Sequence, residues 1–413
     1  MSDIRPFRGY RPRPDLAAKV ASPPYDVLSS DEARTLAADN PHSFLHVVKA
    51  EIDLDPGVET HSEPVYAKSA ENYRRLIVDG ILVRDAAPSF YLYELTMKGH
   101  AQTGLVVGCS VDEYVAGRIK KHEHTRRDKE DDRARHVEVL MANAGPVLFT
   151  YRQRPEIQAL VASLKAKGAP AVDFTADDGV RHVLWVVDDA ADVAALREAF
   201  APLDALYVAD GHHRTASAQR VRDILKAKNP AHTGEEPYNH FLAVLFPDDE
   251  LRLMGYHRVV RDLNGLAPAD FLEKVGERFD LERTDAPEPP GQKQWGMYLD
   301  GKWYRLAARP DSYPADDPVR SLDAAILQES LLAPVLGIGD PRTDERIDFV
   351  GGIRGAAELE RRCSEDMQVA FAFAPVSVEQ LMAIADAGAV MPPKSTWFEP
   401  KLRSGVVVRS LED

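Results

Sequence analysis

The sequence has little of several features that mark other classes of protein. Among its 413 residues are only two cysteines, Cys109 and Cys363, too few for a disulfide framework or a cysteine-based zinc site and typical of a reducing compartment. No apolar run is long enough to span a bilayer, and no apolar segment follows the charges at Asp3, Arg5 and Arg8 as in a secretory signal. We therefore expect a cytoplasmic protein without a membrane partner.

Positive charge is also scarce. The chain has 51 Lys and Arg against 66 Asp and Glu, a formal net charge of -15, and the acidic excess is spread along its length. Proteins that bind nucleic acid gain much of their affinity from clustered Lys and Arg that release counterions, so we expect no nucleic-acid partner. The negative net charge does not exclude a small anionic ligand that is held by a few nearby cationic side chains. The oligomeric state stays open.

The familiar nucleotide motifs are missing as well. The chain has no Gly-x-Gly-x-x-Gly fingerprint, no Gly-x-Ser-x-Gly elbow and no protein-kinase signature. The segment from Gly388 to Ser395 nearly spells a P-loop, but its second glycine is replaced by Pro393, which lacks the N–H that would cradle a phosphate. Lys394 and Ser395 could still contact a phosphate individually.

What is present is an ordinary globular composition, with 44% hydrophobic and 28% charged residues. Apolar strand-like runs alternate with helical patterns, which indicates an α/β fold of the mixed (α+β) kind. A chain of this length is expected to form two or three domains, and we predict three regions: 1–152, 153–283 and 291–413. The segment 284–290, ending in Pro287-Glu-Pro-Pro290, is the predicted linker or exposed loop. A polar loop is predicted from Lys120 to Arg135.

The most informative segment runs from Leu206 to Ala218. An apolar strand leads into a tight turn at Gly211, and a helix follows. Because a helix N-terminus offers free N–H groups and the positive end of a dipole, it attracts anions. Arg214 can grip phosphate oxygens in bidentate fashion, while Asp210 could bind Mg²⁺, orient a histidine or accept a proton. The alternative is a purely structural Asp-Gly turn. The candidate phosphate-binding residues here are Gly211, His213, Arg214 and Thr215.

The second segment, Lys120 to Arg133, is dense in titratable groups. It could supply a general base, Glu123, and phosphate-binding cations, Lys129 and Arg133; a solvated charged loop is an equal alternative. Near the N-terminus, Pro23-Pro-Tyr-Asp26 predicts a rigid turn that could hold a residue beside a ligand. We assign four further residues to the expected pocket: Tyr25, Asp26, His122 and Thr125.

Taken together, these segments resemble the bacterial family called domain of unknown function 1015. The likeness rests on six motifs that occur in the same order over nearly the whole chain: Pro23-Pro-Tyr-Asp26, Lys121-His-Glu-His-Thr125, Lys129-Glu-Asp-Asp-Arg133, Asp210-Gly-His-His-Arg214, Asp340-Pro-Arg342 and Met391-Pro-Pro-Lys-Ser-Thr396. The family's name assigns no activity.

The Asp210-Gly-His-His-Arg214 turn also resembles the phosphate-binding turn of the ParB/sulfiredoxin superfamily, which includes free-serine kinases. This resemblance implies a ParB/sulfiredoxin-like core elaborated by further mixed-sheet and helical segments, with Asp210 and the residues after it at the phosphate and metal positions. It implies Glu123 as the base, and Glu123, Asp210 and His212 as candidate catalytic residues. Sulfiredoxin chemistry is not expected, because its reactive cysteine is replaced by His212.

The leading hypothesis is a phosphotransferase that uses ATP or ADP with Mg²⁺ and acts on a small hydroxyl compound, L-serine among the candidates. Phosphoryl transfer mainly requires that the reactants be positioned and that the negative charge of the phosphates be stabilised. One alternative is a non-catalytic, nucleotide-binding regulatory protein. Another is a metal-dependent hydrolase with Zn²⁺ or Mn²⁺ held by histidines.

Overall fold

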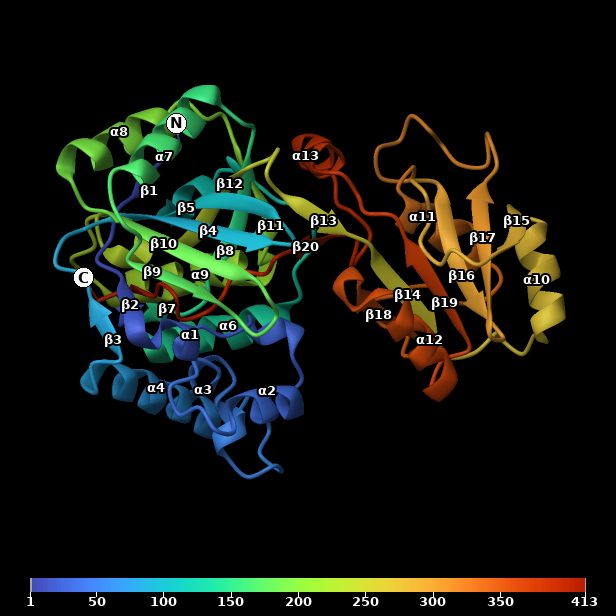
Figure 1. Ribbon diagram of the computed structural model, residues 1–413, viewed down its shortest axis with the longest axis horizontal. Helices are drawn as coiled ribbons and strands as arrows, with labels where there is room; N and C mark the ends of the chain where they lie inside the picture. The colour runs from blue at the N-terminus through green and yellow to red at the C-terminus, as the bar shows by residue number, and fades with distance from the viewer. Residues whose placement is uncertain (1, 413) are drawn as a thin grey trace. The chain divides into compact units, whose positions relative to one another are not determined.

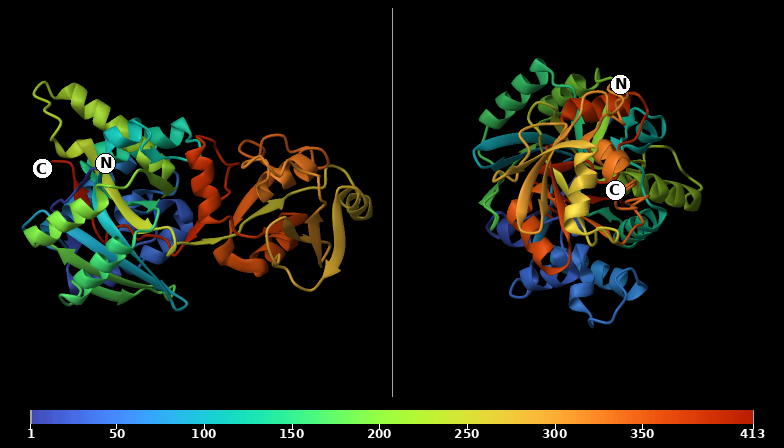
Figure 2. Two further views of the ribbon diagram at one scale, coloured as in Figure 1. Left: turned by 90° about the horizontal axis from the view of Figure 1, so that it is seen from above. Right: turned by 90° about the vertical axis from the view of Figure 1, so that its right-hand side faces the viewer.

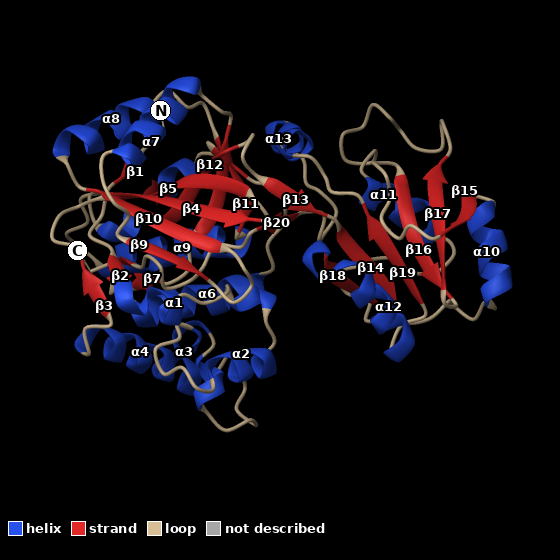
Figure 3. Ribbon diagram, viewed as in Figure 1, coloured by secondary structure: helices blue, strands red, loops and turns tan. Residues whose placement is uncertain are grey.

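In the computed structural model, which describes residues 2–412, the chain forms two compact units (Figure 1). The first contains the described residues up to Lys121, Thr125–Leu251 and the residues from Pro400 onward; the second contains His122–His124 and Arg252–Glu399. Both units combine helices with strands (Figure 3), which confirms the mixed α/β prediction. The three predicted regions stay a prediction, and the compact units have other boundaries.

A nine-stranded sheet organises the first unit, in the order β6-β11-β8-β12-β5-β4-β10-β9 with β1 also paired to β5. Neighbouring strands are antiparallel except for β11 with β6 and β12 with β8. The central strand β12 is buried along its whole length, as its apolar sequence predicts. The strands are β1 (Ile4–Arg5), β4 (Phe90–Met97), β5 (His100–Ser110), β6 (Ile119–Lys120), β8 (Val147–Tyr151), β9 (Val172–Thr175), β10 (Arg181–Val187), β11 (Leu206–Asp210) and β12 (His240–Pro247).

Helices complete this unit, and the apolar side chains of sheet and helices form its largest core, which includes Phe149, Phe200 and Leu245. Two short strand pairs, β2 with β3 and β7 with β21, lie outside the main sheet. The helices are α1 (Ala17–Val20), α2 (Ser30–Ala37), α3 (Leu45–Val48), α4 (Glu63–Val78), α5 (Val111–Val115), α6 (Arg127–Leu140), α7 (Pro155–Ala166), α8 (Ala190–Phe200) and α9 (His212–Lys228), and the short strands are β2 (Tyr10–Pro12), β3 (Leu82–Arg84), β7 (Ala142–Asn143) and β21 (Arg409–Ser410).

The predicted polar loop from Lys120 to Arg135 is wrong over most of its length, because helix α6 begins at Arg127. The buried face of this helix carries Asp132 and His136 beside Ala134 and Leu140. A pattern search that looks for apolar residues at the helical period misses a helix whose buried face is half polar. Asp128 and Glu130 lie in its first turn, where acidic side chains stabilise a helix.

A six-stranded antiparallel sheet organises the second unit, in the order β15-β17-β16-β19-β14-β18. Trp295, Phe279 and Phe371 lie in its core, and β13 pairs with β20 outside the sheet. The elements are β13 (Arg252–Met254), β14 (Tyr256–Val260), α10 (Pro268–Gly276), β15 (Phe279–Thr284), β16 (Gln294–Leu299), β17 (Lys302–Ala308), α11 (Asp323–Leu327), β18 (Ile347–Gly351), α12 (Gly355–Glu365), β19 (Val369–Phe373), α13 (Val378–Asp386) and β20 (Trp397–Glu399).

The proline-rich segment 284–290 connects β15 and β16, two strands of one sheet. It is therefore an exposed loop inside the second unit and not a linker between domains. Figure 2 allows each unit to be followed from two further directions. Within residues 2–412, no helix has both the length and the apolar character that crossing a membrane requires.

The core of the first unit gives a stability prediction. Phe149 is fully buried in β8, beside the strand that ends at Asp210. We expect Phe149→Ala to lower the free energy of unfolding by about 3–5 kcal/mol, because it removes buried surface and leaves a cavity. Urea denaturation followed by circular dichroism measures this. Val83→Ala is the control, since Val83 is exposed and should change stability by about 0.5 kcal/mol or less; equal effects of the two variants would contradict the described core.

Candidate functional site

The predicted strand–turn–helix is present. Strand β11 ends at Asp210, Gly211 follows, and α9 begins at His212. Gly211 has φ 97° and ψ 33°, and a Cβ atom there would lie 2.9 Å from Cγ1 of Val147. A side chain would be strained by both the backbone conformation and the close approach. The glycine therefore lets the N-terminus of α9 begin directly at the end of the strand.

Asp210 is held in an ion pair. Its Oδ2 accepts a hydrogen bond from Nζ of Lys401 at 3.0 Å. Burial acts to raise the pKa of the Asp210 carboxyl, but the positive charges of Lys401 and Arg214 outweigh it and hold the pKa well below its usual range. The carboxylate is therefore ionised at neutral pH. Its side chain is 31% exposed, so it can still meet a ligand.

Arg214, two positions after the start of α9, is a largely buried cation. Its Nη1 donates to the carbonyl of Pro146, and its Nη2 lies 3.9 Å from Oδ2 of Asp26. Burial acts to lower its pKa, but the carboxylates of Asp26 and Asp210 raise it above the ordinary value. Its buried Nε has no hydrogen-bond partner among the described residues. A charged donor in this state favours an anionic ligand.

The remaining residues of the turn have defined roles in the fold. The N–H of Arg126 donates to Nε2 of His213 at 3.1 Å, so the start of α6 lies against the turn. Thr215 is fully buried, and its hydroxyl donates to the carbonyl of Gly211 at 3.1 Å. Its proton is therefore used within the helix. His212 is also buried.

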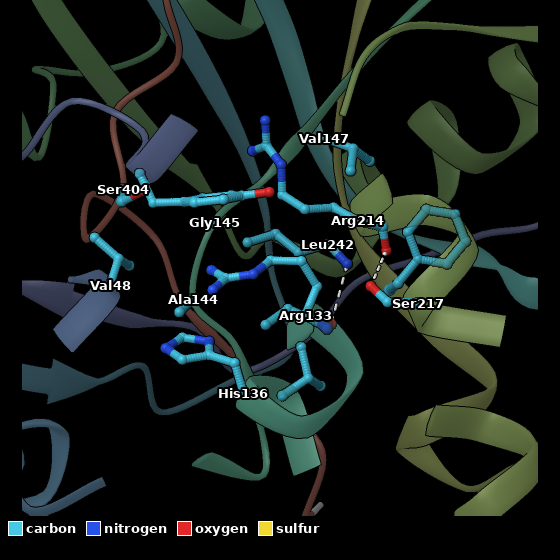
Figure 4. A pocket seen from close by; sticks show the side chains of 14 residues that line it. Val48, Arg133, His136, Ala144, Gly145, Val147, Arg214, Ser217, Leu242 and Ser404 are labelled. Carbon is cyan, nitrogen blue, oxygen red and sulfur yellow. Dashed lines mark hydrogen bonds between the residues drawn. The ribbon is translucent and has the colours of Figure 1, made fainter. Parts of the chain in front are cut away.

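A cavity of about 40 Å³ lies beside Arg214 (Figure 4). Its wall contains two arginines and no acidic side chain. Arg133 reaches it from α6, with its guanidinium carbon 3.9 Å from the centre of the Tyr25 ring. Burial and the neighbouring Asp26 raise the pKa of Tyr25 to about 12, which keeps its hydroxyl protonated. The fourteen lining residues are Tyr25, Val48, Arg133, His136, Val137, Asn143, Ala144, Gly145, Val147, Arg214, Ser217, Phe241, Leu242 and Ser404.

The predicted rigid turn at Pro23–Asp26 is anchored to the far end of the chain. The backbone groups of Ser22 and Ser404 exchange two hydrogen bonds, of 3.0 and 2.9 Å. The turn continues into a short 3-10 helix, Tyr25–Val27. Tyr25 consequently lines the cavity and Asp26 approaches Arg214.

The other predicted site residues divide between the two units. Thr125 bonds to Glu130, and Nζ of Lys129 lies 3.5 Å from a ring nitrogen of His61, all in the first unit. His122 and Glu123 belong to the second unit.

Lys394 and Ser395 belong to the second unit with them. There the carbonyl of His122 accepts from the N–H of Met391 at 2.8 Å, the hydroxyl of Ser395 donates to the carbonyl of Pro392 at 2.7 Å, and Nζ of Lys394 lies 5.6 Å from the centre of the Tyr256 ring. The predicted residues thus form two groups, one in each unit.

Sequence reasoning missed Lys401, Gly145 and Ser404. Lys401 lies within the segment from Met391 to Leu402, where we predicted phosphate contacts for Lys394 and Ser395 only. No pattern in that segment distinguishes the lysine that reaches Asp210 from the one that does not. Gly145 and Ser404 line the cavity without belonging to any motif.

The residues suit Mg²⁺ better than a transition metal. Among residues 2–412, no three His, Cys, Asp or Glu side chains gather as a metal-binding group. Mg²⁺ does not need such a cage, since it is commonly held by one or two carboxylates together with substrate phosphates. The ionised, partly exposed carboxylate of Asp210 fits that pattern.

The ion pair at Asp210 gives a pH-dependent prediction. Because folding lowers the pKa of Asp210, the pair stabilises the fold above the unfolded pKa of 3.8, and this contribution is lost as pH falls through the folded pKa. We expect Lys401→Met to lower the free energy of unfolding by about 1–2 kcal/mol at pH 7, by the same amount at pH 5, and by less at pH 3. Urea denaturation at these pH values measures it, with the exposed Lys19→Met as control. A difference that persists undiminished at pH 3 would contradict the pairing.

Solved structures of similar fold include a free serine kinase in complex with AMP, 13% identical, covering 71% of this chain and 86% of that chain at a TM-score of 0.36. A conserved hypothetical protein from Pyrococcus furiosus is 14% identical over 75% of this chain and 96% of that chain, at 0.37. C-terminally truncated SbnI from Staphylococcus aureus is 13% identical over 71% and 82%, at 0.36. At scores this low the likenesses say nothing about activity.

No curated protein matches the chain. A family model does match, over residues 4–325, and its description is "Protein of unknown function (DUF1015)". The match spans most of the chain and includes four of the six motifs on which the resemblance rested, among them Pro23–Asp26, Lys121–Thr125 and the turn at Asp210–Arg214. The chain belongs to the DUF1015 family.

Proposed function

We propose that this protein is a phosphotransferase that binds the phosphates of ATP or ADP at the turn Asp210–Arg214 and transfers a phosphoryl group to a small hydroxyl compound, with L-serine the first candidate. One observation carries the proposal: two cations, Arg214 and Lys401, meet an ionised carboxylate, Asp210, at the N-terminus of a long helix. Phosphoryl transfer depends mainly on such positioned charges.

The phosphate end of the site is the N-terminus of α9. The first N–H groups of a helix have no partner within it and point toward an anion. Arg214 adds a guanidinium whose charge is assured by two carboxylates and whose Nε is unpaired among the described residues. Lys401 supplies a second positive charge beside Asp210. These groups would neutralise the charge that the phosphate oxygens carry.

Asp210 would hold Mg²⁺, and Asp26 is a second carboxylate beside Arg214. When bound, Mg²⁺ would supply further charge neutralisation at the phosphates. Because the pKa of Asp210 is far below neutral, this carboxylate is a weak proton acceptor. Asp210 therefore suits the metal better than it suits the role of general base. We propose Glu123 for that role, on the resemblance of the turn to the ParB/sulfiredoxin superfamily.

The cavity limits what can enter the site. A volume of about 40 Å³ has room for roughly two or three water molecules. An adenosine group is far larger, so it would lie outside the cavity, with only its phosphates at the turn. The cavity itself is left for a small chemical group.

The nucleotide site is tested by Arg214→Ala. We expect ADP to bind about 10- to 100-fold more weakly, which corresponds to the loss of a charge-assisted hydrogen bond of about 1.5–3 kcal/mol. Isothermal titration calorimetry with Mg²⁺ measures the affinity. Lys226→Ala is the matched control, because it removes an exposed positive charge from the last turn of the same helix.

Turnover is tested by incubating the protein with L-serine and ATP or ADP and detecting the phosphorylated product by mass spectrometry. We expect Arg214→Ala to form no such product. Turnover equal to the unmodified protein in Arg214→Ala would disprove the proposed site. Binding of nucleotide without product, over a panel of amino acids and small alcohols, would instead favour the nucleotide-binding regulatory protein.

The role of Glu123 is tested by Glu123→Gln, which keeps the shape of the side chain and removes its basicity. If Glu123 takes the hydroxyl proton, turnover should fall about 10²- to 10⁴-fold while ADP affinity stays within twofold. Glu273→Gln, an exposed acid of the second unit, is the control. Unchanged turnover in Glu123→Gln would assign the base elsewhere and leave the phosphate site intact.

A further inference from the structure

We propose that the cavity beside Arg214 binds a small carboxylate, with Arg133 as the side chain that recognises it. That this carboxylate belongs to the phosphoryl acceptor rests on the proposed function; that the cavity takes a carboxylate rests on its lining alone. The acceptor would then carry both a hydroxyl and a carboxylate, as hydroxy acids and hydroxy-amino acids do.

The charge of the wall selects an anion. Arg133 and Arg214 are the two charged lining residues, and none of the fourteen is acidic. The third basic residue, His136, is neutral, because burial and the nearby Arg133 lower its pKa to about 4. The carboxylates that pair with these arginines, Asp132 and Asp26, lie outside the lining, so a ligand in the cavity meets guanidinium groups and no acidic side chain, which favours a carboxylate.

Arg133 is fixed in place for this task. Its Nε donates to Oδ2 of Asp132 at 2.7 Å, its Nη2 lies 2.6 Å from the same oxygen in an ion pair, and its flat face stacks on Tyr25. Because Asp132 engages one edge of the guanidinium, Nη1 is the nitrogen that can meet a ligand. A guanidinium held on one edge and one face recognises a planar carboxylate in a defined orientation.

Asp132 is in turn a positioning residue. The Tyr66 hydroxyl donates to it at 2.8 Å, and Nδ1 of His61 lies 3.0 Å away. Burial acts to raise its pKa, but the charge of Arg133 and the hydrogen bonds from Tyr66 and Arg133 together outweigh this and lower the pKa, so Asp132 stays ionised. The hydrogen bonds and ion pairs that hold Asp132 and Arg133 are thus already formed in the free protein. This lowers the entropy cost of binding a ligand.

A carboxylate fits this wall better than a phosphate does. Much of the lining is apolar: Val48, Val137, Ala144, Val147, Phe241 and Leu242. A phosphate would bring three or four charged oxygens against these side chains, and burying them without donors is costly. The residues Gly211–His213, where α9 begins, are not part of the lining. A carboxylate presents only two oxygens, and the carbon chain behind it suits the apolar side.

The experiment compares ligands with and without a carboxylate. L-serine, D-glycerate and propionate carry it, while L-serinamide replaces it with an amide; inorganic phosphate is the competing anion. Binding to the full chain is measured by calorimetry without nucleotide. We expect at least one of the three carboxylates to bind, and L-serinamide and phosphate to bind at least 10-fold more weakly than that carboxylate.

Variants then assign the site. Arg133→Gln should weaken carboxylate binding 10- to 100-fold and leave ADP affinity within twofold. Arg135→Gln is the matched control, because Arg135 lies two positions along α6, has a side chain that is 40% exposed and pairs with Glu63. Ala144→Val is a second test that keeps every charge; its added carbons should fill the cavity and exclude the carboxylate. Thermal melts verify that the variants fold.

The outcomes separate the two proposals. The carboxylate site would be overturned if none of the three carboxylates binds, or if L-serinamide or phosphate binds as tightly as they do. It would also be overturned if a carboxylate binds with unchanged affinity to both Arg133→Gln and Ala144→Val. If carboxylates bind through Arg133 but no phosphorylated product forms, the cavity assignment stands and the phosphotransferase proposal fails. If acceptors that lack a carboxylate are phosphorylated, and Arg133→Gln leaves their KM unchanged, the phosphotransferase proposal stands and the carboxylate site fails.

Discussion

The buried positive charge of Arg214 is the constraint on which the site depends. A guanidinium cannot lose its proton at physiological pH, so burying it requires acceptors and negative charge around it. The carbonyl of Pro146 and the carboxylates of Asp26 and Asp210 provide them. These groups come from the N-terminal turn, the start of β8 and the end of β11. One buried cation thereby fixes three distant stretches of chain around a single cavity.

The ends of the chain are drawn into the same arrangement. Ser22 pairs with Ser404 through two backbone hydrogen bonds, and Lys401 reaches Asp210. The first unit is consequently built from segments that the second interrupts. Its site needs residues from the beginning, middle and end of the sequence, so a truncated fragment would lose a wall of the cavity. The division into contiguous regions that length and composition suggest does not capture this, because it assumes that neighbours in space are neighbours along the chain.

The sequence predicted what is encoded locally. An apolar run predicted the strand, a glycine predicted the turn at Gly211, and the change to a helical period predicted the helix after it. The motifs identified the family. Helix α6 was missed because Asp132 and His136 occupy its buried face. Lys401 was missed because its partner is 191 positions away, and no local pattern specifies a pair at that distance. The sequence also could not show that Glu123 and Asp210 belong to different units.

The charge distribution explains how an acidic protein can hold an anion. The net charge of -15 repels anions at long range, but over more than about 8 Å that repulsion is largely screened at physiological ionic strength. Within the site, Arg133, Arg214 and Lys401 are mostly buried, with side chains 11%, 14% and 16% exposed, and salt screens their interactions with a ligand much less. Anion affinity at this site should therefore depend weakly on salt, unlike that of a basic surface patch. Because each cation is also matched by its own carboxylate, Asp132, Asp26 or Asp210, the free protein avoids a cluster of unpaired positive charge, and a ligand adds to an arrangement that is already stable.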